Sequence, residues 1–239
     1  GYHFGGGLYD AAAGRCTAGS RENVNAYGWI QSYARRLGVE ASRTFKSGFA
    51  TAYSSPRNAF LDGKVAMVVQ GPWLANVINA YKPDLDYGVA PFPVAAGLHD
   101  DANPIGLIDT DILVIPRGVR HPGACMEFIA YTQRQEVVEF LSTAHCKMSP
   151  LAESSDAFLA NHPNRGVRAH TAIAGSTRSF LCPRTRTWPQ FKDEFDASFQ
   201  RLWGLERSAG EELAALERRA QAMLDRAASE RARRTRGGA

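Results

Sequence analysis

One tryptophan occupies the position in this sequence that is best suited to hold a small polar molecule. Trp73 follows Gly71-Pro72, which are separated by Gln70 from the apolar run Val65–Val69. An indole offers a flat apolar face for stacking, and the C–H groups of a sugar ring could cover it. Gly71 would let a ligand approach the backbone, and the amides of a helix that starts here would supply donors. We therefore predict ligand binding at Gly71 and Trp73; the competing interpretation is a core tryptophan that caps a helix.

A second group of polar side chains precedes another apolar run. Asp109, Thr110 and Asp111 come directly before Ile112–Ile115. A carboxylate suits bidentate hydrogen bonding to paired hydroxyls, because charged acceptors are stronger than neutral ones. We predict these three residues as ligand contacts. The alternative is that they cap a loop or remain solvated.

Other chemistries lack a motif in this sequence. It contains no H-E-x-x-H, no G-x-G-x-x-G, no phosphate-binding G-x-x-x-x-G-K-[ST] and no G-x-S-x-G. Asp193-Glu194 and Glu211-Glu212 are predicted on solvated helix faces and form no carboxylate dyad. The cysteines, which form no C-x-x-C pair, leave pairing or free thiols open: Cys16, Cys125, Cys146 and Cys182. We therefore expect no enzyme activity, no catalytic residue, no metal and no cofactor.

Short apolar runs and helical periodicity alternate along the chain. The runs predict buried strands at Val65–Val69, Tyr87–Ala90 and Ile112–Ile115. Periodicity and capping residues predict helices over 20–37, 56–62, 72–80, 122–134, 136–144, 162–174, 191–202 and 209–228, with a short helix after Ser149 and a loop over 45–55. This alternation predicts an α/β protein with a mostly parallel sheet. Trp73 would then follow the carboxyl end of a strand, where ligands bind in such sheets.

A series of motifs resembles one known family. They are Phe4-Gly5-Gly6-Gly7-Leu8-Tyr9-Asp10, Phe60-x-x-Gly63-Lys64-Val65-Ala66-Met67, Gly71-Pro72-Trp73, Tyr87-Gly88-Val89-Ala90-Pro91, Leu113-Val114-Ile115-Pro116, Ser149-Pro150-Leu151, His162-Pro163-Asn164 and Pro183 with Trp188. In this order, over nearly the whole chain, they resemble the extracellular solute-binding proteins of family 1. These are the maltose-binding-protein-like components of ABC sugar importers.

The resemblance implies a fold and a division of the chain. It implies the two-lobed, class II periplasmic-binding-protein fold, here mainly the carboxyl-terminal lobe. Residues 1–89 and 135–239 would build that lobe, and 90–134 would cross into an amino-terminal lobe that is mostly absent. Because family members are longer, we expect a fragment that binds ligand weakly or not at all by itself.

The resemblance also implies a function and further site residues. The chain would bind a sugar or oligosaccharide between two lobes and deliver it to the transmembrane subunits of an ABC permease. The protein would be a monomer, periplasmic or extracellular, with or without a lipid anchor. Trp73 would stack on the sugar, Trp188 would border the cleft or pack under its helix, and Phe4 and Gly6 would lie at the cleft edge. The alternatives are a non-sugar solute, such as a polyamine or phosphate ester, and a carbohydrate-active enzyme, which needs two facing carboxylates.

The charge of the chain is concentrated at its end. The net charge is +4, and Arg231, Arg233, Arg234 and Arg236 account for it, since the other basic residues balance the 24 acidic ones. We predict a basic, disordered tail over 231–239. No aromatic residue lies among these arginines, so nucleic-acid binding is not expected. No run of about 18 apolar residues is present to span a membrane.

Overall fold

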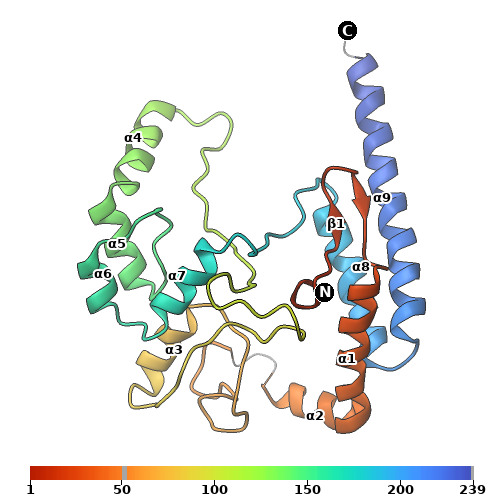
Figure 1. The fold of residues 1–239 in the computed structure, drawn as a ribbon. Helices are drawn as coiled ribbons and strands as arrows, with labels where there is room; N and C mark the ends of the chain where they lie inside the picture. Colours follow the sequence, from red (N-terminus) through yellow and green to blue (C-terminus); the bar gives the residue numbers. More distant parts are fainter. Residues whose placement is uncertain (50–52, 238–239) are drawn as a thin grey trace. The chain divides into compact units, whose positions relative to one another are not determined.

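The structure, a computed structural model, describes the backbone of residues 1–49 and 53–237 (Figure 1). The chain divides into two compact units. Unit 1 comprises residues 1–48, 93–99 and 180–239, and unit 2 comprises residues 49–92 and 100–179. These boundaries do not coincide with the predicted lobe boundaries, and the assignment of 1–89, 90–134 and 135–239 to lobes stays a prediction.

Unit 1 is built mainly from helices. Its elements are η1 (Tyr2–Phe4), β1 (Tyr9–Asp10), β2 (Arg15–Cys16), α1 (Arg21–Leu37), α2 (Val39–Phe49), α8 (Trp188–Trp203) and α9 (Ala209–Gly237). Helix α1 begins where predicted, because the Ser20 side chain accepts a hydrogen bond from the Asn23 amide. It ends at Gly38, whose φ of 83° suits a residue without a side chain.

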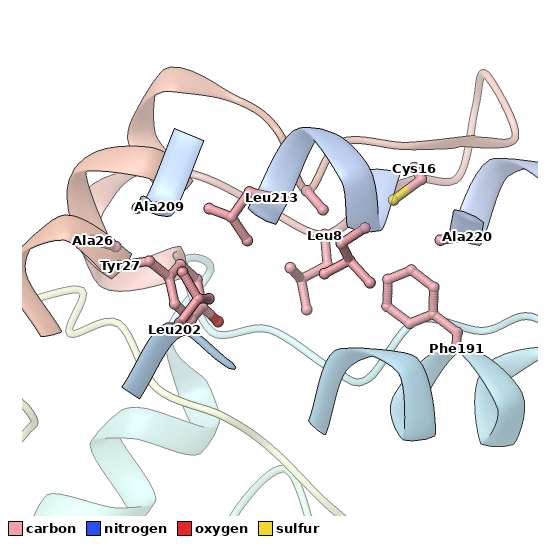
Figure 2. Close-up of a cluster of buried hydrophobic side chains, with 11 residues drawn as sticks. Leu8, Cys16, Ala26, Tyr27, Phe191, Leu202, Ala209, Leu213 and Ala220 are labelled. Carbon is pink, nitrogen blue, oxygen red and sulfur yellow. The ribbon is translucent and has the colours of Figure 1, made fainter. Parts of the chain in front are cut away.

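The core of unit 1 lies where α1, α8 and α9 meet (Figure 2). Leu213, Leu216 and Ala220 of α9 are fully buried against Phe191 and Leu202 of α8. Residues three or four apart lie on one face of a helix. The periodicity that predicted helices over 191–202 and 209–228 therefore corresponds to their buried faces.

Glu212 corrects a prediction, because its side chain is not solvated. Its exposed fraction is 0%. Its Oε1 accepts hydrogen bonds from Ser198 (2.7 Å), Arg201 (2.7 Å) and Arg219 (2.9 Å). The position adjoins the apolar stripe of α9, and partners from α8 let the charge be buried. Two of the three partners, Ser198 and Arg201, lie on another helix, so the pattern of α9 alone did not reveal them.

Unit 2 carries the remaining helices, coloured yellow to teal in Figure 1. They are α3 (Leu74–Tyr81), α4 (Pro122–Thr132), α5 (Gln135–Ala144), α6 (Asp156–Asn161) and α7 (Val167–Gly175). The predicted helix at 56–62 is a series of turns, and the segment after Ser149 contains bends. Helix α6, which Ser155 caps, was not predicted. Helix α7 begins five residues later than predicted, because His162 and Asn164 form a hydrogen-bonded turn instead.

The predicted strands of unit 2 are extended but unpaired in the described residues. Met67 is 86% exposed and Ile112 is 76% exposed, so the prediction of buried strands is wrong for this chain. Tyr87–Ala90 is likewise extended without helix or strand pairing. Within the described residues the sheet is the two-stranded, antiparallel β1–β2 pair of unit 1. A strand is completed only by hydrogen bonds to a neighbour, and the predicted parallel sheet is not formed by these residues.

Two further segments differ from the prediction. Helix α2 extends to Phe49, so the predicted loop over 45–55 is helical in its first part, and residues 50–52 lie outside the described chain. The backbone of 231–237 continues α9, whereas we expected disorder over 231–239; residues 238–239 lie outside the described chain. Ala and Arg are strong helix formers, which favours this continuation.

Candidate functional site

Trp73 lies at the start of α3 and is half-buried. One part of its side chain packs against the cluster of Leu61, Leu74, Val77 and Ile78. The indole edge lies over Gly71, since a Cβ added there would be 2.9 Å from Trp73 Cδ1. The side chain is thus neither sealed in the core nor fully bare. Gly71 provides space for the indole, and its role as a ligand contact stays a prediction.

The first amides of α3 already have acceptors. Leu74 N donates to the Gly71 carbonyl (3.2 Å), Ala75 N to that of Pro72 (3.1 Å) and Asn76 N to that of Trp73 (3.0 Å). The expectation that this helix end offers free donors is therefore wrong for these three amides. Proline at position 72 sets up the turn, and the turn carbonyls satisfy the helix end. What remains for a ligand is the exposed part of the indole.

Asp109, Thr110 and Asp111 are exposed in unit 2. Asp109 Oδ1 accepts a hydrogen bond from the Thr110 amide (3.0 Å). Asp111 Oδ2 lies 2.6 Å from Lys147 Nζ. The hydrogen bond from Lys147, together with its charge, holds the pKa of Asp111 below its usual value. Asp111 is thus an ionised carboxylate with a cation beside it.

The other predicted site residues, Phe4, Gly6 and Trp188, belong to unit 1 and take part in packing. Trp188 is half-buried at the start of α8 and stacks on Phe191, with ring centroids 5.5 Å apart. Phe4 packs against the same core and lies 6.0 Å from the Trp29 ring, centroid to centroid. A Cβ at Gly6 would be 2.5 Å from Asn23 Oδ1. Their role as ligand contacts stays a prediction.

Three residues that are joined by hydrogen bonds were not predicted as functional. They are Lys147, His162 and Asn164, all in unit 2. Asn164 Nδ2 donates to the Pro72 carbonyl, 3.2 Å away, and Lys147 pairs with Asp111. The motif His162-Pro163-Asn164 was the only signal, and it was interpreted as the start of a helix. Hydrogen bonds between residues 92 positions apart leave no periodic pattern in a sequence.

Metal and thiol chemistry find no support in the described part of the chain. No group of three or more His, Cys, Asp or Glu side chains is arranged there to hold a metal ion. The four cysteines are free thiols. Within the described residues, no helix combines the length and apolarity needed to cross a bilayer.

The structure is similar to solved structures of sugar-binding proteins, and two of the following three hold a sugar. CpMnBP1 with mannotriose bound superposes with a TM-score of 0.74 at 23% identity, over 90% of this chain and 54% of that one. The ABC substrate-binding protein Lmo0181 from Listeria monocytogenes, in complex with cycloalternan, gives 0.67 at 15% identity, over 93% and 54%. The cyclic α-maltosyl-1,6-maltose binding protein from Arthrobacter globiformis gives 0.63 at 16% identity, over 93% and 53%.

These likenesses, all below 25% identity, establish the fold. The chain has the fold of about half of an ABC substrate-binding protein, and it spans about half the length of the structures that it matches. The predicted class of fold is thereby confirmed, although these residues by themselves are rich in helix. No family model matches the sequence, and no curated protein matches it.

Proposed function

We propose that this chain is part of the substrate-binding component of an ABC importer for a sugar or oligosaccharide. The observation that carries the proposal is a half-exposed tryptophan, Trp73, at the start of a helix in a fold shared with proteins solved with mannotriose and cycloalternan bound. The exposed part of the indole would stack on a sugar ring. Delivery to permease subunits, a periplasmic or extracellular location and a monomeric state follow from the same resemblance.

The pairing of a predicted site carboxylate, Asp111, favours a neutral ligand over a polyamine. A polyamine would need several unpaired carboxylates beside an aromatic ring. Asp111, however, already pairs with Lys147. The alternative of a polyamine is therefore not favoured by this geometry, and the solved structures of similar fold hold sugars rather than a phosphate ester.

A glycosidase is also disfavoured. A catalytic general acid needs a raised pKa so that it stays protonated near neutral pH. The pKa of Asp111 is lowered by the hydrogen bond from Lys147. The proteins of similar structure from Listeria monocytogenes and Arthrobacter globiformis are binding proteins.

Saturation-transfer NMR with mannotriose tests the proposal. Because few groups besides the indole are placed to hold a sugar, we expect a weak complex with a dissociation constant of about 1 mM or weaker. Signal transfer to the sugar should disappear in Trp73→Ala and persist in Trp29→Ala, which truncates a partly exposed tryptophan of unit 1. Transfer that survives Trp73→Ala would contradict the stacking role. Transfer to spermidine in place of mannotriose would favour the polyamine alternative.

A further inference from the structure

Asn164 is a buried side chain whose hydrogen bonds converge on the turn before Trp73. It is 2% exposed. Its Nδ2 donates to the carbonyls of Pro72 (3.2 Å) and Cys146 (2.9 Å), and its Oδ1 accepts from the Gly166 amide (2.8 Å). Each of these partners is backbone, so the side chain ties three chain segments together. Burial of an amide is tolerated when its donors and acceptor are satisfied in this way.

The Pro72 carbonyl connects the hydrogen bonds of Asn164, which we call the Asn164 frame, to the candidate ligand site. It is one residue before Trp73, and it also accepts the Ala75 amide of α3 (3.1 Å). On the other side, the indole edge rests on Gly71. The orientation of the indole is therefore set by a turn that Asn164 holds from within unit 2.

The Asn164 frame also includes the turn after α5, through the hydrogen bond from Asn164 to the Cys146 carbonyl. Asn76 Nδ2 of α3 donates to the His145 carbonyl (2.7 Å), and Asn79 Nδ2 lies 3.7 Å from Cys146 Sγ. Cys146 has a φ of 52°, a left-handed conformation that costs energy for a residue with a side chain. The hydrogen bond from Asn164 to the Cys146 carbonyl holds this turn. The next residue, Lys147, carries the ammonium that pairs with Asp111.

His162 links Asn164 to Lys147, with one ring nitrogen in contact with each residue. Its Nδ1 lies 3.1 Å from the Asn164 amide, and its Nε2 lies 3.0 Å from the Lys147 carbonyl. An amide N–H needs an acceptor and a carbonyl needs a donor, so these two contacts fit the tautomer that carries a proton on Nε2. His162 thus joins the Asn164 turn to the segment that carries Lys147.

We propose that Asn164 is a positioning residue of the ligand site: it fixes the Gly71–Trp73 turn to the same frame that holds Lys147 against Asp111. A stacking residue contributes most when its ring is already oriented before the ligand arrives. Asn164 itself touches no ligand in this scheme. The inference rests on the proposed function for its meaning, but its structural part can be measured without any sugar.

The test uses the 239-residue chain labelled with 5-fluorotryptophan and observed by ¹⁹F NMR. The Trp73 resonance is assigned as the one missing in Trp73→Phe. Trp29, Trp188 and Trp203 belong to unit 1 and serve as internal references. Asn164→Asp keeps an acceptor for Gly166 and removes both Nδ2 donations, so it should shift or broaden the Trp73 resonance and leave the three references in place.

Two control variants separate positioning from general loss of stability. Asn161→Asp changes an exposed asparagine of α6, whose Nδ2 donates only locally to Ala157, and should leave the Trp73 resonance unchanged. Val138→Ala truncates a buried side chain of α5 and should lower the melting temperature without moving that resonance. If Asn164→Asp leaves the Trp73 resonance unmoved, or if Val138→Ala moves it equally, the positioning role is overturned. If Asn164→Asp fails to fold, Asn164→Ser is measured by the same criteria.

Titration with mannotriose then distinguishes this inference from the proposed function. We expect the Trp73 resonance of the unsubstituted chain to respond to mannotriose, with about fivefold weaker apparent affinity in Asn164→Asp, the effect of losing about one net hydrogen bond. An equal response in both chains would overturn positioning and leave the sugar role standing. The Trp73 resonance could instead move in Asn164→Asp and show no response to mannotriose. That outcome would support the positioning role of Asn164 and overturn sugar binding at Trp73.

Discussion

The two units of this chain differ in how completely they bury their apolar side chains. In unit 1, α1, α8 and α9 bury a continuous apolar core that reaches from Leu8 to Ala220. In unit 2, the extended segments at 65–69 and 112–115 leave Met67, Val69, Ile112 and Val114 largely exposed. A helix satisfies its own backbone hydrogen bonds, whereas a strand depends on a neighbour. The helices therefore satisfy their own backbones, whereas segments 65–69 and 112–115 have no strand partner among the described residues.

The largest effect is expected from the core of unit 1. Leu216 is fully buried, so Leu216→Ala removes apolar contacts and leaves a cavity. It should lower the free energy of unfolding of unit 1 by about 2–5 kcal/mol. Hydrogen exchange of α1, α8 and α9 amides across a urea series measures this loss for unit 1 separately. A loss below about 1 kcal/mol would mean that this core is looser than the structure shows.

A second large effect is expected at Glu212. Burial alone would raise its pKa, but hydrogen bonds from Arg201, Ser198 and Arg219 outweigh burial and lower the pKa from 4.5 to about 2. The folded pKa is the lower one, so the stabilisation is present above pH 4.5 and is lost as the pH falls toward 2. Glu212→Gln should cost about 3 kcal/mol at neutral pH, because Arg201 and Arg219 lose their buried partner.

The acid dependence supplies the control for that prediction. Thermal unfolding of unit 1, followed between neutral pH and pH 2, should show a smaller loss of stability in Glu212→Gln than in the unsubstituted chain. Glu211→Gln changes the neighbouring acid, which is exposed and accepts hydrogen bonds from Ser208. It should retain most of the acid dependence. Identical pH profiles for Glu212→Gln and the unsubstituted chain would argue against a strongly lowered pKa at Glu212.

A smaller effect is expected where unit 2 is tightly packed. Gly71→Ala places a Cβ 2.9 Å from Trp73 Cδ1, so the indole must move. We expect a cost of about 1–2 kcal/mol and a displaced Trp73 resonance in ¹⁹F NMR. Gly123→Ala in α4 is the matched substitution, since a Cβ there meets nothing within 4 Å. It should leave the resonance in place and be neutral or slightly stabilising.

The smallest effect is expected in the extended segments of unit 2. Val114→Lys should change the free energy of unfolding by less than about 0.5 kcal/mol, because the valine is exposed and buries little surface. The amides of 112–115 should exchange rapidly, since the described residues offer them no strand partner. A cost of several kcal/mol, or slow exchange of these amides, would mean that this segment of unit 2 is packed as tightly as the core of unit 1.

The sequence-based predictions were more reliable for the helices of unit 1 than for the predicted strands of unit 2. Local signals located α1 between Ser20 and Gly38 and identified the apolar faces of α8 and α9. They failed for the apolar run 65–69, where composition indicated burial that only a neighbouring strand can supply. They also failed for Glu212, whose buried partners come from another helix.

At the candidate site, some features were determined by neighbours along the chain and others by tertiary contacts. The sequence alone determined that a tryptophan follows Gly-Pro at a helix start, because this depends on neighbours along the chain. The tertiary structure decided that the indole rests on Gly71, that Asp111 pairs with Lys147, and that Asn164 holds the turn. The last two contacts join segments that are far apart in the chain, and their hydrogen-bond geometry exists only after the intervening residues have folded.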